Sequence, residues 1–216
     1  MKNIIKFAMI FSVLLMPLTV STMAMAGPDG VTVASEAPGD FVQHVGDQAL
    51  AVIADQSLNK QKKQDSLTKI FAGIVDFPWV GRFVMGRYWR EATDDQKKRY
   101  LTEYKKFLLL HYTSRFTNFS GGTFTLQGVK DDGDGEFTVS MRMKSDAPDS
   151  EPVQVDYRVH AGDIKDGKGH FQIFDVIVEG VGLLNTQRSE FSSVIAEHGV
   201  DYLIDQLVAK SSAGAV

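Results

Sequence analysis

Two stretches in the middle third of the chain alternate apolar and polar residues one by one, and this alternation limits the fold more than any other feature. They are "EFTVSMRMK", from Glu136 to Lys144, and "VQVDYRVH", from Val153 to His160. A period of two places successive side chains on opposite faces of a strand. Both stretches are therefore predicted to be antiparallel strands with one apolar face and one polar face.

Two further strands flank this pair. "TFTLQGVK" precedes it through the polar segment "DDGDG" (131–135), and "GHFQIFDVIVEG" (169–180) follows it. The last strand is apolar on both faces between Phe171 and Val178. We expect such a strand at a central position in the sheet, with a bulge along its length.

Helical periodicity surrounds the strands on both sides. Apolar residues recur every three or four positions after Asp40, which is expected to cap the first helix, and a second such run stops before Pro78. A long helix is predicted from Asp94 to about Phe116, because Thr93 and Gln96 have the spacing of a capping box. Two more helices, divided by a glycine, follow the strands. This order predicts an α+β fold in which a helical layer packs on a curved antiparallel sheet of about four strands.

The first 26 residues have the pattern of a secretory signal peptide. Lys2 and Lys6 precede an apolar run from Phe7 to Val20, and Ala24-Met25-Ala26 is a small-x-small cleavage pattern. The run is too short to span a bilayer, which argues against a membrane anchor. We predict a signal peptide over 1–26, a flexible leader over 27–39, a single domain over 40–210 and a flexible tail over 211–216.

Composition argues against several classes of function. The chain has 23 basic residues, 27 acidic residues and no cysteine. A net acidic chain without a basic stripe argues against nucleic-acid binding, which draws most of its affinity from phosphate neutralisation. Without cysteine there is no disulfide, no thiolate zinc site and no lipidated N-terminal cysteine. We expect a diffusible protein of a bacterial envelope.

Local motifs offer little catalytic chemistry. The segment from Asp131 to Phe137 lacks the spacing of an EF-hand, so a polar hairpin loop is predicted there instead of a calcium site. No Gly-x-Ser-x-Gly elbow occurs, and the five histidines lack metal-ligand spacing. We predict no metal and no cofactor. The histidines are His44, His111, His160, His170 and His198.

One enzymatic alternative stays open at this point. Asp156, Tyr157, His170 and Asp175 could gather at the open end of a cone-shaped sheet, as in ketosteroid-isomerase-like enzymes. In the simpler interpretation, Asp156 faces outward and Asp175 pairs with an arginine such as Arg87 or Arg188.

Two separated motifs carry a family resemblance. "FDVIVEGVGLLNTQRSEF" (Phe174 to Phe191) resembles the pattern "YDVxVEGVSLVxNYRSxF" of the MlaC family, the toluene-tolerance auxiliary component of an ABC transporter. "VDFPWVGRFVMGRYWREATDDQKKRY" (75–100) is similar to the same family's "FDFxxMxRxxLGxxWRxxxxxQ". The chain departs from the first pattern at Gly182, where the family has serine, at Thr186-Gln187, where it has Asn-Tyr, and at Phe171, where it has tryptophan.

The resemblance implies a function. Family members are soluble periplasmic carriers, not enzymes, and they shuttle phospholipids between an outer-membrane lipoprotein complex and an inner-membrane ABC transporter with a substrate-binding membrane subunit. The domain over 40–210 would then bind lipid, with a phospholipid as cargo and acyl chains in an apolar cavity between helices and sheet. The departures leave a hopanoid or sterol-like cargo as an alternative, and a non-transporting adaptor of an envelope complex as another.

The apolar sheet face and the facing helices supply the predicted cavity wall. Three arginines are predicted at a headgroup rim, where guanidinium groups could meet a phosphate; the alternative is that they pair with Asp76, Asp175 or Glu179. The predicted wall residues are Phe83, Phe107, Leu110, Val139, Met141, Val155, Tyr157, Val176, Val178 and Phe191. The predicted rim residues are Arg82, Arg87 and Arg188.

Overall fold

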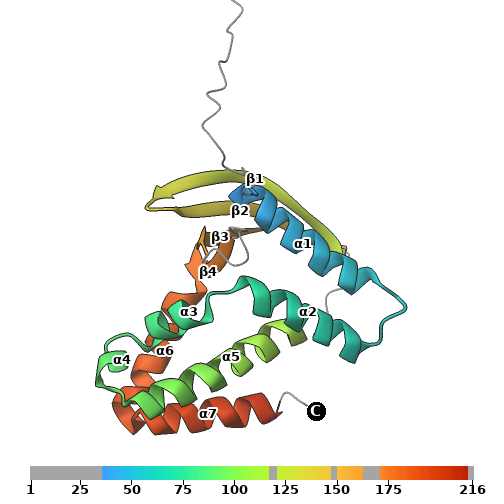
Figure 1. Cartoon of the computed structure of the whole chain (residues 1–216). Helices are drawn as coiled ribbons and strands as arrows, with labels where there is room; N and C mark the ends of the chain where they lie inside the picture. The colour runs from blue at the N-terminus through green and yellow to red at the C-terminus, as the bar shows by residue number, and fades with distance from the viewer. Residues whose placement is uncertain (1–35, 117–120, 147–149, 163–170, 214–216) are drawn as a thin grey trace, which may run out of the picture. The chain divides into compact units, whose positions relative to one another are not determined.

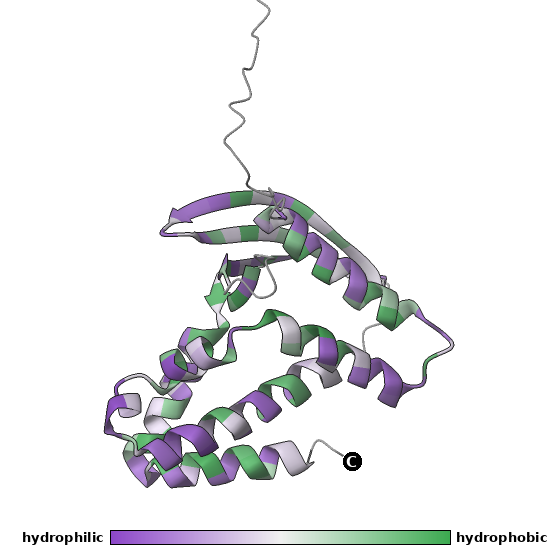
Figure 2. Cartoon of the chain, in the orientation of Figure 1, coloured by the Kyte–Doolittle hydropathy of each residue, from purple (hydrophilic) through white to green (hydrophobic). Residues whose placement is uncertain are grey.

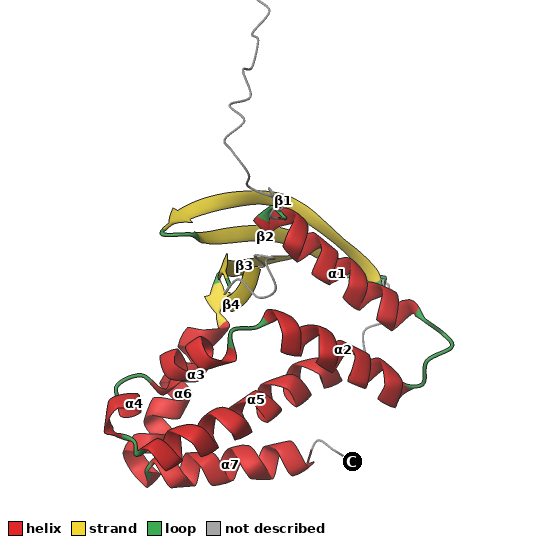
Figure 3. Ribbon diagram, viewed as in Figure 1, coloured by secondary structure: helices red, strands yellow, loops and turns green. Residues whose placement is uncertain are grey.

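Helices and strands follow one another in the order that the sequence predicts (Figures 1 and 3). The structure, a computed structural model, describes residues 36–116, 121–146, 150–162 and 171–213, all within the unit Val33–Val216. The predicted signal peptide, most of the predicted leader, His170 and residues 214–216 lie outside the described residues. The described helices are α1 (Pro38–Ala54), α2 (Lys60–Ile74), α3 (Phe77–Met85), α4 (Tyr88–Glu91), α5 (Asp94–Phe116), α6 (Leu183–His198) and α7 (Val200–Ala213). The described strands are β1 (Gly122–Gly133), β2 (Glu136–Ser145), β3 (Val153–Ala161), β4 (Phe171–Val178) and β5 (Val181–Gly182).

The strands form one antiparallel sheet in the order β1-β2-β3-β4-β5, which confirms the predicted α+β class. The predicted apolar face is a lattice of cross-strand neighbours, because Val139 lies opposite Tyr157 and Tyr157 lies opposite Val176. A second row runs parallel to the first: Met141, Val155 and Val178. The alternation of period two therefore identified the correct apolar face on β2 and β3, and Val176 and Val178 of β4 continue that face.

The acidic loop is a tight hairpin turn between β1 and β2. Asp134 and Gly135 have positive φ angles of 53° and 77°, as a type I′ turn requires at its two central positions. Asp-Gly is a preferred pair for this turn because both residues tolerate the left-handed region. The predicted polar hairpin loop is confirmed.

Strand β4 carries the predicted bulge. Arg158 pairs with Asp175 and the next residue of β3, Val159, pairs with Ile173, so Phe174 is the extra residue. The bulge turns Phe174 into the helical core, where its ring lies 4.8 Å from that of Trp79. Because Phe174 packs there, β4 reads as apolar on both faces. The expected central position is only partly right, since β5 covers the outer edge of β4 for two residues.

A helical core fills the space between α3, α5, α6 and α7, whose apolar stripes face one another (Figure 2). Tyr100 and Tyr104 of α5 are fully buried there with stacked rings, and the Tyr100 hydroxyl donates to the Gly81 carbonyl at 3.1 Å. Gly81 allows this approach, since a Cβ atom at that position would lie 2.5 Å from a side-chain carbon of Leu101. This core holds α5 against the other helices, and Phe174 is the buried residue that β4 contributes to it.

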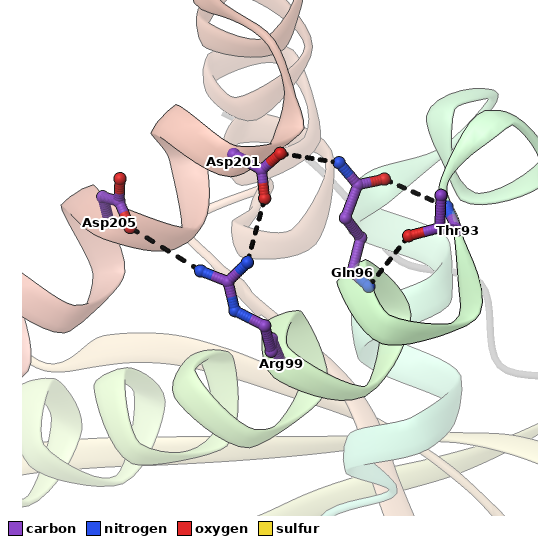
Figure 4. Close-up of polar contacts among 5 residues, drawn as sticks. All are labelled: Thr93, Gln96, Arg99, Asp201 and Asp205. Atoms are coloured by element: carbon purple, nitrogen blue, oxygen red, sulfur yellow. Dashed lines mark hydrogen bonds and ion pairs between the residues drawn. The ribbon is translucent and has the colours of Figure 1, made fainter.

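The predicted capping box begins α5 and also ties α5 to α7 (Figure 4). The Gln96 backbone N–H donates to Thr93 Oγ1 at 3.2 Å, and the Thr93 N–H donates to Gln96 Oε1 at 3.0 Å. The Gln96 side-chain amide donates to Asp201 at 2.9 Å, and Arg99 pairs with Asp201 at 3.0 Å and Asp205 at 3.8 Å. The cap therefore serves both the helix end and the packing of its neighbour.

Two helix ends differ from the prediction. Helix α1 begins at Pro38 with Ala37 as its N-cap, so Asp40 lies in the first turn and does not cap the helix. Proline is favoured at this position because its fixed φ suits the first turn and its missing N–H has no partner there anyway. Helix α7 continues through Ala213, three residues into the predicted flexible tail. No helix among the described residues has the length and apolar character needed to cross a bilayer.

Candidate functional site

An apolar cavity of about 490 Å³ lies between the sheet and the helices. This volume is within the range of roughly 300–1,000 Å³ that is typical of small-molecule sites. Its wall is mostly aliphatic and aromatic, and every described helix except α4 and α7 contributes to it. The lining residues are Val42, Val45, Gly46, Ala49, Leu50, Ile53, Phe71, Ile74, Val75, Phe77, Val80, Leu108, Leu109, Tyr112, Phe124, Met143, Val155, Tyr157, Ile173, Phe174, Asp175, Val176, Val178, Leu183, Leu184 and Gln187.

The sheet wall contains four of the predicted residues. Val155, Tyr157, Val176 and Val178 are neighbours across β3 and β4, and all four line the cavity. Burial raises the pKa of Tyr157 to about 12, so its hydroxyl is neutral at ordinary pH. Contact of these four wall residues with a ligand stays a prediction.

Helix α1 supplies a wall that the sequence analysis did not assign to the cavity. Val42, Val45, Ala49 and Ile53 recur at spacings of three and four and line one side of it. The same helix packs on the sheet at Gly46, where a Cβ atom would lie only 2.0 Å from a ring carbon of Phe124. The periodicity in α1 was a signal of a buried face, but it did not show what that face would meet.

The other six predicted wall residues lie outside the lining. Val139 and Met141 are fully buried in a smaller core that also contains Phe41 and Val42 of α1. Phe191 lies in the helical core with its ring 5.8 Å from that of Tyr104. The remaining three are partly buried helix residues away from the lining: Phe83, Phe107 and Leu110.

The three predicted rim arginines are exposed, and none of them pairs with an acidic group of the described residues. Arg188 lies over the ring of Phe83, with its guanidinium carbon 4.9 Å from the ring centre. Arg82 donates to the Pro78 carbonyl at 3.1 Å, and Arg87 donates to the Tyr88 hydroxyl at 2.8 Å. The alternative partners are otherwise engaged: Asp76 pairs with His160 at 3.2 Å, and Glu179 accepts from the Gln154 N–H at 2.6 Å.

Asp175 is the one carboxylate in the described lining. Its side chain is only 8% exposed, and Oδ1 accepts the backbone N–H groups of Val176 at 2.8 Å and Leu184 at 3.4 Å. Burial raises the pKa of Asp175, while these two bonds and the charge of Arg158 act in the opposite direction. The interpretation in which Asp175 pairs with Arg87 or Arg188 is wrong, because the carboxylate is held by the Val176 N–H of β4 and by the Leu184 N–H in the first turn of α6.

Gln187 is the second polar side chain of the cavity, one helical turn beyond Leu184 on α6. The hydroxyl of Tyr104, which has no exposed surface, donates to Gln187 Oε1. Burial raises the pKa of Tyr104 well above its ordinary value, and neighbouring groups that include Asp175 raise it further. Tyr104 therefore stays a neutral donor and fixes the orientation of the Gln187 amide.

The enzymatic alternative finds limited support in this geometry. Asp175 and Tyr157 do line one cavity, but Asp156 accepts from the Gln154 amide at 3.2 Å and lies opposite Ile177, on the other face of the sheet. His170 lies outside the described residues. Within the described ranges, no group of three or more histidine, aspartate or glutamate side chains has an arrangement that could hold a metal ion.

A family model described as "MlaC protein" matches residues 43–209, which contain almost all of the described structure. The chain belongs to the MlaC family. Two curated relatives of this MlaC chain are the toluene tolerance protein ttg2D of Pseudomonas putida, 24% identical over 79% of both chains, and the intermembrane phospholipid transport system binding protein MlaC of Haemophilus influenzae, 21% identical over 97% of this chain and 96% of its own length.

A solved structure has the same fold. It is the phospholipid-binding protein of Ralstonia solanacearum in complex with a phospholipid, which superposes with a TM-score of 0.70 at 24% identity and covers 84% of this chain and 100% of its own. This likeness confirms the architecture of helices on an open antiparallel sheet.

Proposed function

We propose that this chain is a periplasmic carrier that binds a phospholipid by its acyl chains and moves it between membranes. The apolar cavity is the observation that carries the proposal, because it offers a ligand-sized space lined by aliphatic side chains beside few groups for chemistry. Membership in the MlaC family and the lipid-related names of its relatives support the same function.

The energetics of such a carrier need no catalytic group. Burying one CH₂ group is worth about 0.8 kcal/mol, so exposing about thirty of them from two acyl chains would cost on the order of 20 kcal/mol. A carrier must therefore cover nearly all of both chains, and a bilayer covers them equally well. Transfer between the two is close to balance, so docking to membrane partners sets its direction.

The proposed partners are those that the resemblance to the MlaC family implies. The sequence has no Gly-x-x-x-x-Gly-Lys-Ser/Thr loop, so any energy input comes from another protein. We assign that role to an inner-membrane ABC transporter with a substrate-binding membrane subunit, and the role of lipid donor or acceptor to an outer-membrane lipoprotein complex. The protein works without a cofactor and without enzymatic turnover.

The headgroup lies near solvent on the side of α3 and α6. Phe77, Val80, Leu184 and Gln187 of these two helices line the cavity. The three arginines are exposed residues of the same part of the chain: Arg82 lies in α3, Arg87 follows α3, and Arg188 lies in α6 over the ring of Phe83 in α3. Exposed arginines without acidic partners are suited to a lipid phosphate, which takes two N–H donors from one guanidinium.

Native mass spectrometry of protein purified from cells tests the proposal. The parent protein is expected to carry phospholipid, and Val155→Glu or Val178→Glu should lose it while circular dichroism shows a retained fold, because each places a carboxylate in the apolar wall. Ile177→Glu is the matched control, since Ile177 is the neighbour of Val178 on β4 but faces the other side of the sheet. Lipid retained by both wall variants at parental stoichiometry would contradict the assigned cavity, and a parent that never binds lipid would overturn the carrier function.

A further inference from the structure

The cavity contains a carboxylate oxygen that lacks a protein partner. Asp175 uses Oδ1 for both of its backbone hydrogen bonds, and no group of the described residues donates to Oδ2. Asp175 is 8% exposed and lines the cavity. An apolar ligand in the cavity would displace water from the polar atoms of its wall, so a donor group on that ligand would find an acceptor in Oδ2.

Gln187 places N–H donors into the same part of the cavity. Its Oε1 accepts from the Tyr104 hydroxyl, which has no other acceptor among the described residues. This contact orients the amide so that Nε2, which no described group accepts from, remains available on the cavity wall. Leu184 donates to Asp175 of β4, and Gln187 lies three residues beyond Leu184 on the same face of α6, so helix α6 brings Gln187 to the part of the cavity that Asp175 lines.

Gly182 explains why Oδ2 is free. A Cβ atom at Gly182 would lie 3.8 Å from Oδ2, close enough for a serine hydroxyl on that carbon to reach it. The backbone of Gly182, with φ −72° and ψ 122°, accepts any residue, and serine is the residue that the family pattern has there. In this chain the position lacks a hydroxyl group and therefore supplies no donor to Oδ2.

We propose that Asp175 Oδ2 and Gln187 Nε2 form a subsite for a hydroxyl group of the bound lipid, an inference that rests on the proposed lipid-carrier function. A hydroxyl is the group that both donates to the carboxylate and accepts from the amide. An ammonium group would leave the amide N–H without an acceptor, and a phosphate or ester oxygen would face the carboxylate lone pairs. The subsite thus selects lipids with a free hydroxyl close to their acyl chains, on either the glycerol backbone or the headgroup.

A competition experiment tests this subsite. Delipidated protein is offered an equimolar mixture of a palmitoyl lysophospholipid, which has a free glycerol hydroxyl, and its methyl ether, and bound lipid is counted by native mass spectrometry. Since a hydrogen bond to a charged group is worth about 1.5–3 kcal/mol, the parent should prefer the hydroxyl lipid by roughly tenfold or more. A second mixture, phosphatidylglycerol and phosphatidylethanolamine with identical chains, shows whether a headgroup hydroxyl is selected instead.

Three variants separate the subsite from the rest of the cavity. Gly182→Ser supplies the missing hydroxyl from the protein and should bring the preference close to one. Asp175→Asn keeps Oδ1 for its backbone donors but presents an N–H group in place of Oδ2, with the same expected result. Gly182→Ala adds only a methyl group in ordinary contact and should keep the parental preference.

The possible results distinguish a failure of the subsite from a failure of the carrier function. Equal binding of both members of both mixtures by the parent overturns the subsite and leaves the lipid carrier intact. An unchanged preference in Gly182→Ser and Asp175→Asn, or a preference lost equally in Gly182→Ala, also overturns it. Failure of the parent to bind any of the four lipids overturns the carrier function and the subsite with it.

Discussion

Two helical glycines allow a sharp test of how α1 packs on the sheet. Gly46 lies in the middle of α1 against the ring of Phe124, and Gly73 is the second-last residue of α2, with no atom within 4 Å of the Cβ position. Replacing glycine by alanine gains helix propensity of up to about 1 kcal/mol in a helix interior and less near a helix end, as at Gly73. Only at Gly46 does the new methyl group meet an obstacle, at 2.0 and 2.2 Å from two ring carbons of Phe124.

The difference in the free energy of unfolding between the two variants largely cancels the gain in helix propensity and leaves the cost of the contact with Phe124. Contacts under 3.0 Å cannot persist, so either the Phe124 ring moves into the cavity or α1 moves off the sheet. Overpacking of this kind costs about 1–3 kcal/mol. We therefore expect Gly73→Ala to raise the free energy of unfolding by up to about 1 kcal/mol, and Gly46→Ala to fall below Gly73→Ala by about 1–3 kcal/mol.

Urea unfolding of delipidated protein, followed by circular dichroism, measures both variants, because bound lipid would add its own stabilisation. The double variant Gly46→Ala/Phe124→Leu relieves the contact and should recover most of the loss that Gly46→Ala shows against Gly73→Ala. If Gly46→Ala and Gly73→Ala stabilise the protein equally, then α1 does not pack on β1 at this point and the α1 wall of the cavity is wrongly placed.

Three further predictions concern single groups. Because burial raises the pKa of Asp175 above the ordinary value of 3.8, the folded state holds this proton more tightly than the unfolded chain does. The resulting stabilisation is present at low pH and is lost as the pH rises through the folded-state pKa. Asp175→Asn has no such proton to lose, so its free energy of unfolding, measured against pH, should gain on that of the parent over this rise. Thr93→Ala should lower the unfolding free energy by about 0.5–2 kcal/mol through loss of the capping box, whereas Thr102→Ala on the exposed face of the same helix should change it little. Arg188→Met should leave the free energy of unfolding within about 0.5 kcal/mol, since Arg188 is exposed and makes no ion pair with a described residue, but it should slow lipid uptake from anionic vesicles at low salt; uptake at the parental rate would remove Arg188 from the rim.

The sequence was sufficient for the elements whose signals are local. The alternation in β2 and β3, the Asp134-Gly135 turn and the Thr93–Gln96 box each depend on residues within a few positions, and each is present in the structure. The family resemblance also depends on short motifs, and the family model confirms it. Such local patterns are kept in the folded protein because the local preference and the tertiary packing favour the same structure.

The sequence could not show which residues of the apolar sheet face line the cavity and which are covered by a helix. Met141 and Val155 lie opposite each other on one face of the sheet, yet Met141 is covered by α1 and its core cluster while Val155 reaches the cavity. Nothing within either strand distinguishes them, because the difference comes from where α1 crosses the sheet. The sequence could name Asp175 as a candidate but could not choose between the cavity and an arginine partner, because its place depends on the bulge at Phe174 and on the start of α6.

The arrangement of the apolar residues explains how a cavity of this size persists. Among the described residues, all buried apolar side chains except Val155 belong to one of three clusters: one among the helices with Phe174 of β4, one between α1 and the sheet, and a small one between α1 and α2. The cavity is lined by members of all three, such as Leu184, Ile173 and Ala49. The side chains of each cluster pack against one another, so none of the clusters needs a side chain in the space between them. Acyl chains in that space would add apolar contacts to all three clusters at once, which is why an apolar ligand would stabilise this fold in proportion to its affinity.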